Sequence, residues 1–120
     1  MRKQYTTALL KNKAMNDNTY QIRRNVMDII YKVKKYVPDM PRMTVRVTEN
    51  DEHILGVARM NNNIIWISER HSNNFSTVLH EILHAWKGIE HNENCMLMSP
   101  YHNPRLTDKK AMELFLTYVQ

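Results

Sequence analysis

The chain has 120 residues, of which 42% are hydrophobic and 24% charged, a composition typical of one compact globular domain rather than of a disordered chain. No apolar run approaches the ~20 residues that a transmembrane helix requires, and the amino terminus lacks the apolar core and cleavage site of a secretory signal. The one cysteine, Cys95, has no intrachain partner for a disulfide. We therefore expect a cytoplasmic protein with no membrane partner.

The net charge of +5 is unevenly distributed along the chain. Residues 1–46 contain 11 Lys/Arg against 3 Asp, whereas residues 47–120 contain 6 against 9 Asp/Glu. If the protein has an acidic partner, that partner is expected to meet the basic first third. The simplest interpretation of these basic side chains is the solvated face of a helix, and contact with nucleic acid is the less favoured alternative.

The first third of the chain divides into an arm and a helix. Residues 1–17 are polar and basic, and we expect a loose arm or a short edge strand there, followed by a single domain over residues 18–120. From Thr19 onward the apolar residues recur at helical spacing. This pattern predicts an amphipathic helix that is stopped by Pro38 and Pro41.

Three strand-like runs follow the prolines. Residues 43–48 alternate and are rich in β-branched side chains, which favours a strand. Two further apolar runs, residues 54–60 and 64–68, are separated by three asparagines. Gly56 weakens an interior strand but suits a sheet edge that another backbone approaches closely.

A second helix is predicted to follow Asn73 and Asn74, either of which can cap its amino terminus. It continues to about Lys87, and Gly88 is placed to end it in a left-handed turn. After an irregular stretch, Thr107 caps a last helix. The sequence thus predicts an α+β fold with an amino-terminal helix, a small mixed β-sheet, a central helix and a carboxy-terminal helix.

The central helix contains the motif H-E-x-x-H at residues 80–84. Positions four apart share a helix face, so His80 and His84 can bind one metal ion. Glu81 is set to one side, where it can take a proton from a metal-bound water. His91 is a third candidate ligand, and three histidines leave the fourth position for water, as in catalytic zinc sites. The alternative is a chance match on an amphipathic helix.

The run from Asn74 to Asn92, with Met96-Leu97-Met98-Ser99-Pro100 after it, resembles the metzincin zinc peptidases, and most closely their matrixin branch. The pattern of that family is H-E-x-x-H-x-x-G-x-x-H, then a Met-turn of M-x-P type, then a carboxy-terminal helix. The resemblance covers about the last 50 residues. It implies a zincin-like fold and one catalytic Zn²⁺, held by His80, His84 and His91 with Glu81 as general base and Met98 in the Met-turn.

The resemblance extends, less distinctively, to the strand over residues 54–60. In matrixin-like enzymes a strand at the rim of the cleft pairs with an extended substrate. The resemblance therefore implies that Gly56, Val57 and Ala58 offer backbone groups to a protein or peptide substrate. The alternative is an ordinary internal strand.

One spacing departs from the family pattern. The glycine and the third histidine follow the second histidine by four and seven residues here, instead of three and six. An extra residue turns an ideal helix by ~100°, so the helix either runs one residue longer or contains a π-type bulge near residues 85–87. If His91 is not a ligand, the substitutes are His102, Glu93 and Asp108.

Three functions are compatible with these residues. The first, and the one we expect, is a zinc-dependent endopeptidase in which metal-activated water and Glu81 hydrolyse internal peptide bonds. The second is a DNA-associated peptidase of the SprT-like kind, which also uses H-E-x-x-H and is favoured by the basic first third. The third is a non-catalytic binding module stabilised by its metal. The compact form suits a viral or bacterial protein.

Overall fold

The computed structural model describes residues 2–48, 62–68, 74–101 and 103–120, and for residues 2–18 and Thr48 it describes the backbone. The described elements are, in chain order, α1 (Arg2–Tyr36), β1 (Thr44–Thr48), β2 (Ile64–Ser68), α3 (Phe75–Ile82), the π-helical segment η2 (Leu83–Lys87) and α4 (Asp108–Val119). They form a small α+β domain, in agreement with the class expected from the sequence.

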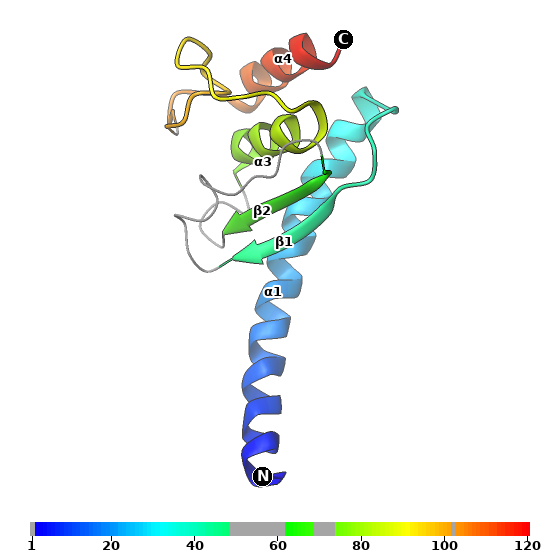
Figure 1. Cartoon of the computed structure of the whole chain (residues 1–120), viewed down its shortest axis with the longest axis vertical. Helices are drawn as coiled ribbons and strands as arrows, with labels where there is room; N and C mark the ends of the chain where they lie inside the picture. Colours follow the sequence, from blue (N-terminus) through cyan, green and yellow to red (C-terminus); the bar gives the residue numbers. More distant parts are fainter. Residues whose placement is uncertain (1, 49–61, 69–73, 102) are drawn as a thin grey trace.

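Helix α1 is longer than the sequence pattern indicates. The expectation of a loose arm or short edge strand over residues 1–17 is wrong, because the helix begins at Arg2. The segment contains no glycine or proline, and extending a helix that tertiary packing already stabilises adds one hydrogen bond per residue. The helix ends at Tyr36, as predicted, since Pro38 lacks an N–H and disfavours helix at the residue before it. Its amino-terminal half projects away from the other elements (Figure 1).

The described sheet is one parallel pair. Strands β1 and β2 run in register from Thr44 opposite Ile64 to Thr48 opposite Ser68, which confirms two of the three predicted strands. The side chains alternate across the pair, with Val45, Ile65 and Ile67 buried on the face toward the helices. The third predicted strand, residues 54–60, lies outside the described residues.

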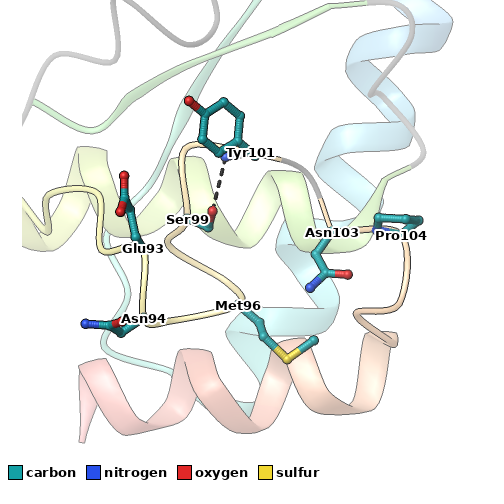
Figure 2. A pocket seen from close by; sticks show the side chains of 7 residues that line it. All are labelled: Glu93, Asn94, Met96, Ser99, Tyr101, Asn103 and Pro104. Carbon is teal, nitrogen blue, oxygen red and sulfur yellow. Dashed lines mark hydrogen bonds between the residues drawn. The ribbon is translucent and has the colours of Figure 1, made fainter.

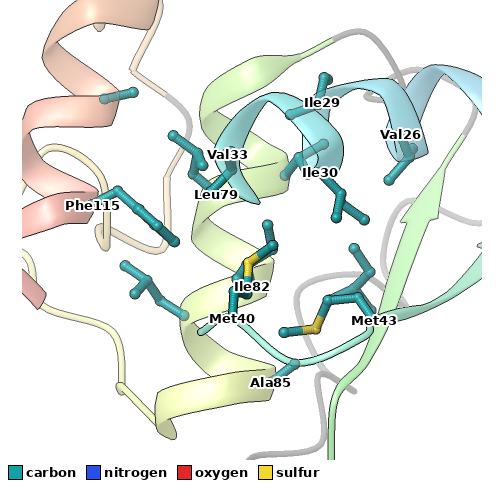
Figure 3. Close-up of a cluster of buried hydrophobic side chains, with 14 of the residues drawn as sticks. Val26, Ile29, Ile30, Val33, Met40, Met43, Leu79, Ile82, Ala85 and Phe115 are labelled. Atoms are coloured by element: carbon teal, nitrogen blue, oxygen red, sulfur yellow. The ribbon is translucent and has the colours of Figure 1, made fainter. Parts of the chain in front are cut away.

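One hydrophobic core joins the elements (Figure 3). Helix α3 contacts α1, β2 and α4, so its side chains lie at the centre of the domain (Figure 1). Among the fully buried core residues are Val26, Val33, Ile65, Ile67, Val78, Leu79, Ile82, Leu83, Met98 and Phe115. Burial on several sides explains why α3 can carry polar side chains in fixed positions. Among the helices of the described part, none is both long and apolar enough to cross a membrane.

A substitution of Phe115 tests the contact between α4 and this core. The Phe115 side chain is fully buried and points toward α3 (Figure 3). We expect Phe115→Ala to lower the free energy of unfolding by about 3–5 kcal/mol, because it removes buried apolar surface and leaves a cavity. Urea denaturation followed by circular dichroism measures this change. The exposed Lys109→Ala on the same helix is the control, with a change within about 0.5 kcal/mol. Equal midpoints for the two variants would contradict the packing described above.

Candidate metal centre

The amino terminus of α3 is fixed by its cap. The side chain of Asn74 accepts hydrogen bonds from the backbone N–H of Thr77, at 3.3 Å, and from the Ser76 hydroxyl, at 2.8 Å. Asn74 was one of the two predicted caps, and satisfying an otherwise unpaired N–H of the first turn is what such a residue contributes. The cap sets where the helix begins and therefore which positions turn inward. These inward positions include His80 and Glu81, both buried.

The extra residue between the second and third histidines is absorbed in η2. Residues Leu83–Lys87 form a π-helical turn directly after α3, which is one of the two arrangements predicted from the spacing. Gly88 then ends the helix with φ 64° and ψ 27°, the left-handed conformation. Its N–H bonds to the His84 carbonyl, and the N–H of Ile89 bonds to the Leu83 carbonyl. The chain thereby turns out of the helix at Gly88.

This turn brings three histidines together. The ring centroids of His80, His84 and His91 are 4.5, 4.8 and 5.1 Å apart in pairs, and one nitrogen from each lies within 4.8 Å of the others. The Nε2 atoms of His80 and His84 are 2.9 Å apart. Two nitrogens that bind one tetrahedral zinc at ~2.1 Å are about 3.4 Å apart, so the spacing of the His80–His84 pair is close to that value. The His91 ring is exposed.

The protonation of His80 and His84 follows from their hydrogen bonds. The Nδ1–H of His80 donates to the Leu97 carbonyl at 2.7 Å, and that of His84 donates to the Ile89 carbonyl. Burial lowers the pKa of His80 to about 4 and also lowers that of His84, so both rings are neutral near pH 7. Their two Nε2 lone pairs then face each other at 2.9 Å. Facing lone pairs repel, and a cation shared between them removes that repulsion.

Glu81 lies beside this cluster in the chain and is 1% exposed. Its Oε2 is buried without a hydrogen-bond partner among the described residues. Burial raises the pKa of Glu81 to about 8, because desolvation disfavours the carboxylate. The three convergent imidazole nitrogens are a donor set that could hold a metal ion. Glu81 follows His80 directly in the chain as a buried acid with an unpartnered oxygen.

The other predicted site residues have different outcomes. Met98 is fully buried in the core, in the loop that supplies the Leu97 carbonyl. Gly56, Val57 and Ala58 lie outside the described residues, as does His102, one of the three substitutes for His91. The other two substitutes, Glu93 and Asp108, line separate surface pockets and do not belong to the histidine cluster.

The loop after His91 is folded back on itself and docked on α4. The N–H of Asn92 donates to the Met98 carbonyl at 2.9 Å, and the N–H of Ser99 donates to the Cys95 carbonyl. A hydrogen bond to the Cys95 side chain raises the pKa of Tyr118, on α4, to about 12. These contacts fix the loop that carries the Leu97 carbonyl, and so they help to orient the His80 ring.

The same loop forms a surface pocket of about 260 Å³ (Figure 2). Its lining includes Glu93, Met96, Ser99 and Tyr101, and the N–H of Tyr101 donates to the Ser99 hydroxyl. Sequence reasoning missed this pocket and the two carbonyls that orient the histidines. Backbone carbonyls carry no side-chain signal, and the pocket depends on how an irregular loop folds.

Comparison with known proteins gives no relative: no family model, no curated protein and no solved structure matches this chain.

Metal content tests the three-histidine assignment. We expect about one zinc per purified chain, with a large reduction in His84→Ala and in His91→Ala, since a catalytic zinc site has three protein ligands. Elemental analysis after dialysis measures this ratio. Glu90→Ala is the control, because its side chain is exposed and outside the cluster. Zinc lost in His84→Ala but retained in His91→Ala would remove His91 from the ligand set.

Substitutions of Gly88 test the turn that returns the chain to the histidine cluster. Gly88→Ala is expected to lower the free energy of unfolding by about 1–2 kcal/mol, because a side chain clashes at positive φ. Gly88→Asn should cost less, since asparagine tolerates this conformation. Urea denaturation ranks the two variants, and an alanine variant as stable as the native chain would contradict the left-handed turn.

Proposed function

We propose that this protein is a zinc-dependent endopeptidase of metzincin type. The observation that carries the proposal is the facing pair of neutral His80 and His84 nitrogens, joined by His91 and adjoined in the chain by buried Glu81. The H-E-x-x-H motif, the glycine turn and the M-x-P segment support the family assignment. Met98 is proposed as the Met-turn residue, and its burial is compatible with that role.

The donor set favours zinc. Three imidazole nitrogens suit a borderline-soft divalent ion, whereas magnesium and calcium prefer oxygen ligands. Three protein ligands rather than four are typical of a catalytic site, because one coordination position stays open. When bound there, Zn²⁺ lowers the pKa of a coordinated water toward ~7 and polarises the substrate carbonyl.

The chain's own residues supply positioning and proton transfer. The Leu97 and Ile89 carbonyls hold the His80 and His84 rings so that each presents Nε2 as the ligand atom. Glu81 accepts a proton from the attacking water and passes it to the leaving amine. Its burial favours this cycle, because a carboxyl group in a dry setting transfers protons near neutral pH more readily than a solvated one.

A peptide is the proposed substrate. The assignment of Gly56, Val57 and Ala58 to a substrate-pairing strand stands as part of this proposal. The first lining residue of the pocket in Figure 2, Glu93, follows His91 by two residues. With Met96 and Tyr101 also in its lining, the pocket can accommodate one substrate side chain. A metal-stabilised binding module is the competing function, and it leaves the buried, unpartnered Glu81 oxygen without a role.

Glu81→Gln separates catalysis from metal binding. We expect the zinc-loaded variant to cleave an unfolded, fluorescently labelled protein at least about 100-fold more slowly than the native chain, because an amide cannot act as the base. Its zinc content should be unchanged, since Glu81 is outside the ligand set. His84→Ala and chelator-treated protein are the inactive controls. Full activity in Glu81→Gln would refute the assigned mechanism.

The same assay decides between the peptidase and the binding module. The module predicts that the zinc-loaded native chain cleaves no unfolded protein, while zinc removal unfolds it. The peptidase predicts cleavage that chelation abolishes and zinc restores.

A further inference from the structure

The outward side of α1 carries a row of aromatic and basic side chains. Tyr20, Arg24, Tyr31 and Lys35 are spaced by four, seven and four residues, and this spacing keeps them within a narrow arc of the helix. Lys34 borders the same arc. We call these five residues the basic–aromatic face. All five are exposed, opposite the side on which Val26, Val33 and their neighbours enter the core.

The charge of the protein is concentrated on this helix. Helix α1 contains 9 Lys/Arg against 2 Asp, whereas the other residues contain 8 Lys/Arg against 10 Asp/Glu. Where side chains of α1 are described, every Lys and Arg is exposed, and none forms a salt bridge with another described residue. Asp28 is the acidic side chain of that stretch. Such a helix attracts a polyanion along its length.

The tyrosines add a second property to the face. Tyr20, Tyr31 and Tyr36 are 62%, 60% and 68% exposed, and with Met96 and Tyr101 they are the large hydrophobic residues most exposed in the described part of the chain. Three of these five exposed hydrophobic residues, the tyrosines Tyr20, Tyr31 and Tyr36, therefore lie on α1, the most basic element. An aromatic ring beside a cation is the pairing that stacks on an unpaired base while the cation holds its phosphate.

A groove continues the face at the carboxyl end of α1. It has a volume of about 580 Å³ and lies where α1, α3 and α4 meet. Lys32, Lys35 and Tyr36 line it from α1, so Lys35 belongs both to the groove and to the face. The other lining residues are Phe75, Asp108, Lys109, Met112, Glu113 and Leu116. The apolar and basic side chains of this lining together suit a base with its phosphate, despite the two carboxylates on α4.

We propose that the basic–aromatic face and this groove bind single-stranded nucleic acid. The exposed rings favour a single strand over a duplex, since bases stacked in a duplex do not offer their faces to a tyrosine. A membrane surface is disfavoured because the face lacks the exposed leucines or phenylalanines that insert into lipid. This site is separate from the metal ligands, and the proposal does not depend on peptidase activity.

Fluorescence anisotropy with a labelled oligothymidylate tests the proposal over a range of salt concentrations. The affinity should fall with salt, with a slope of about −0.7 for each phosphate that is neutralised. Arg24→Gln/Lys35→Gln should bind roughly tenfold more weakly at low salt and reduce the slope by about 1.4. Arg105→Gln/Lys110→Gln is the charge-matched control on other elements, and it should bind like the native chain. Equal losses in both double variants would overturn the proposed face.

Single substitutions test the Tyr31 ring of the face and Asp28, an exposed acidic residue of the same helix. Tyr31→Ala should bind about fivefold to tenfold more weakly, while Tyr31→Phe should bind normally, since stacking needs the ring and not the hydroxyl. Asp28→Asn should bind more tightly. Glu81→Gln should bind like the native chain, so a failure of the peptidase proposal leaves this result readable. Circular dichroism verifies that each variant is folded.

Competition identifies the class of partner. An unlabelled single strand should displace the probe at lower concentration than the matching duplex or vesicles that contain phosphatidylserine. Displacement by the duplex at equal or lower concentration would overturn the preference for single strands. Displacement by vesicles at equal or lower phosphate concentration would overturn the assignment to nucleic acid.

Discussion

The imidazole rings of His80 and His84 are buried, and each ring is held by a hydrogen bond to a backbone carbonyl. These two bonds tie three parts of the chain together: α3 with η2, the turn at Ile89 and the loop at Leu97. Without them, two polar rings would be desolvated and unpaired, which is costly in a protein interior. The two hydrogen bonds fix both tautomers, and they thereby leave the two Nε2 atoms as the candidate ligand atoms.

The π-helical turn is the second constraint. The third histidine follows the second by seven residues. This interval is too long for the compact turn of the family that the sequence resembles. The wider turn at Leu83–Lys87 takes up the extra residue, and Gly88 reverses the chain. Extra residues in π-helical turns are frequent at functional sites, because the insertion re-aims a side chain without breaking the helix. Here it places His91 beside His80 and His84.

The candidate metal centre and the basic–aromatic face lie on different elements, and the position of each follows from where the core lies. Two of the three candidate metal ligands, His80 and His84, are buried on α3 and η2, and the third, His91, is exposed in the loop that follows. The basic–aromatic face requires exposure, so it lies on the side of α1 that the core leaves free. A protein of 120 residues can hold both, because a helix buries one side and presents the other to solvent.

Local patterns determined much of this protein. Helical periodicity predicted the packed part of α1, alternation predicted β1 and β2, and Asn74, Gly88 and Thr107 mark helix ends through backbone chemistry that acts over a few residues. The H-E-x-x-H spacing placed two histidines on one face for the same reason. The helical state of residues 2–17 follows from the extension of a helix that is already formed. Tertiary structure decided the choice of a π-helical turn and the return of His91 to the cluster. Both features depend on contacts between residues that are distant in sequence, and a local sequence pattern contains no information about such contacts.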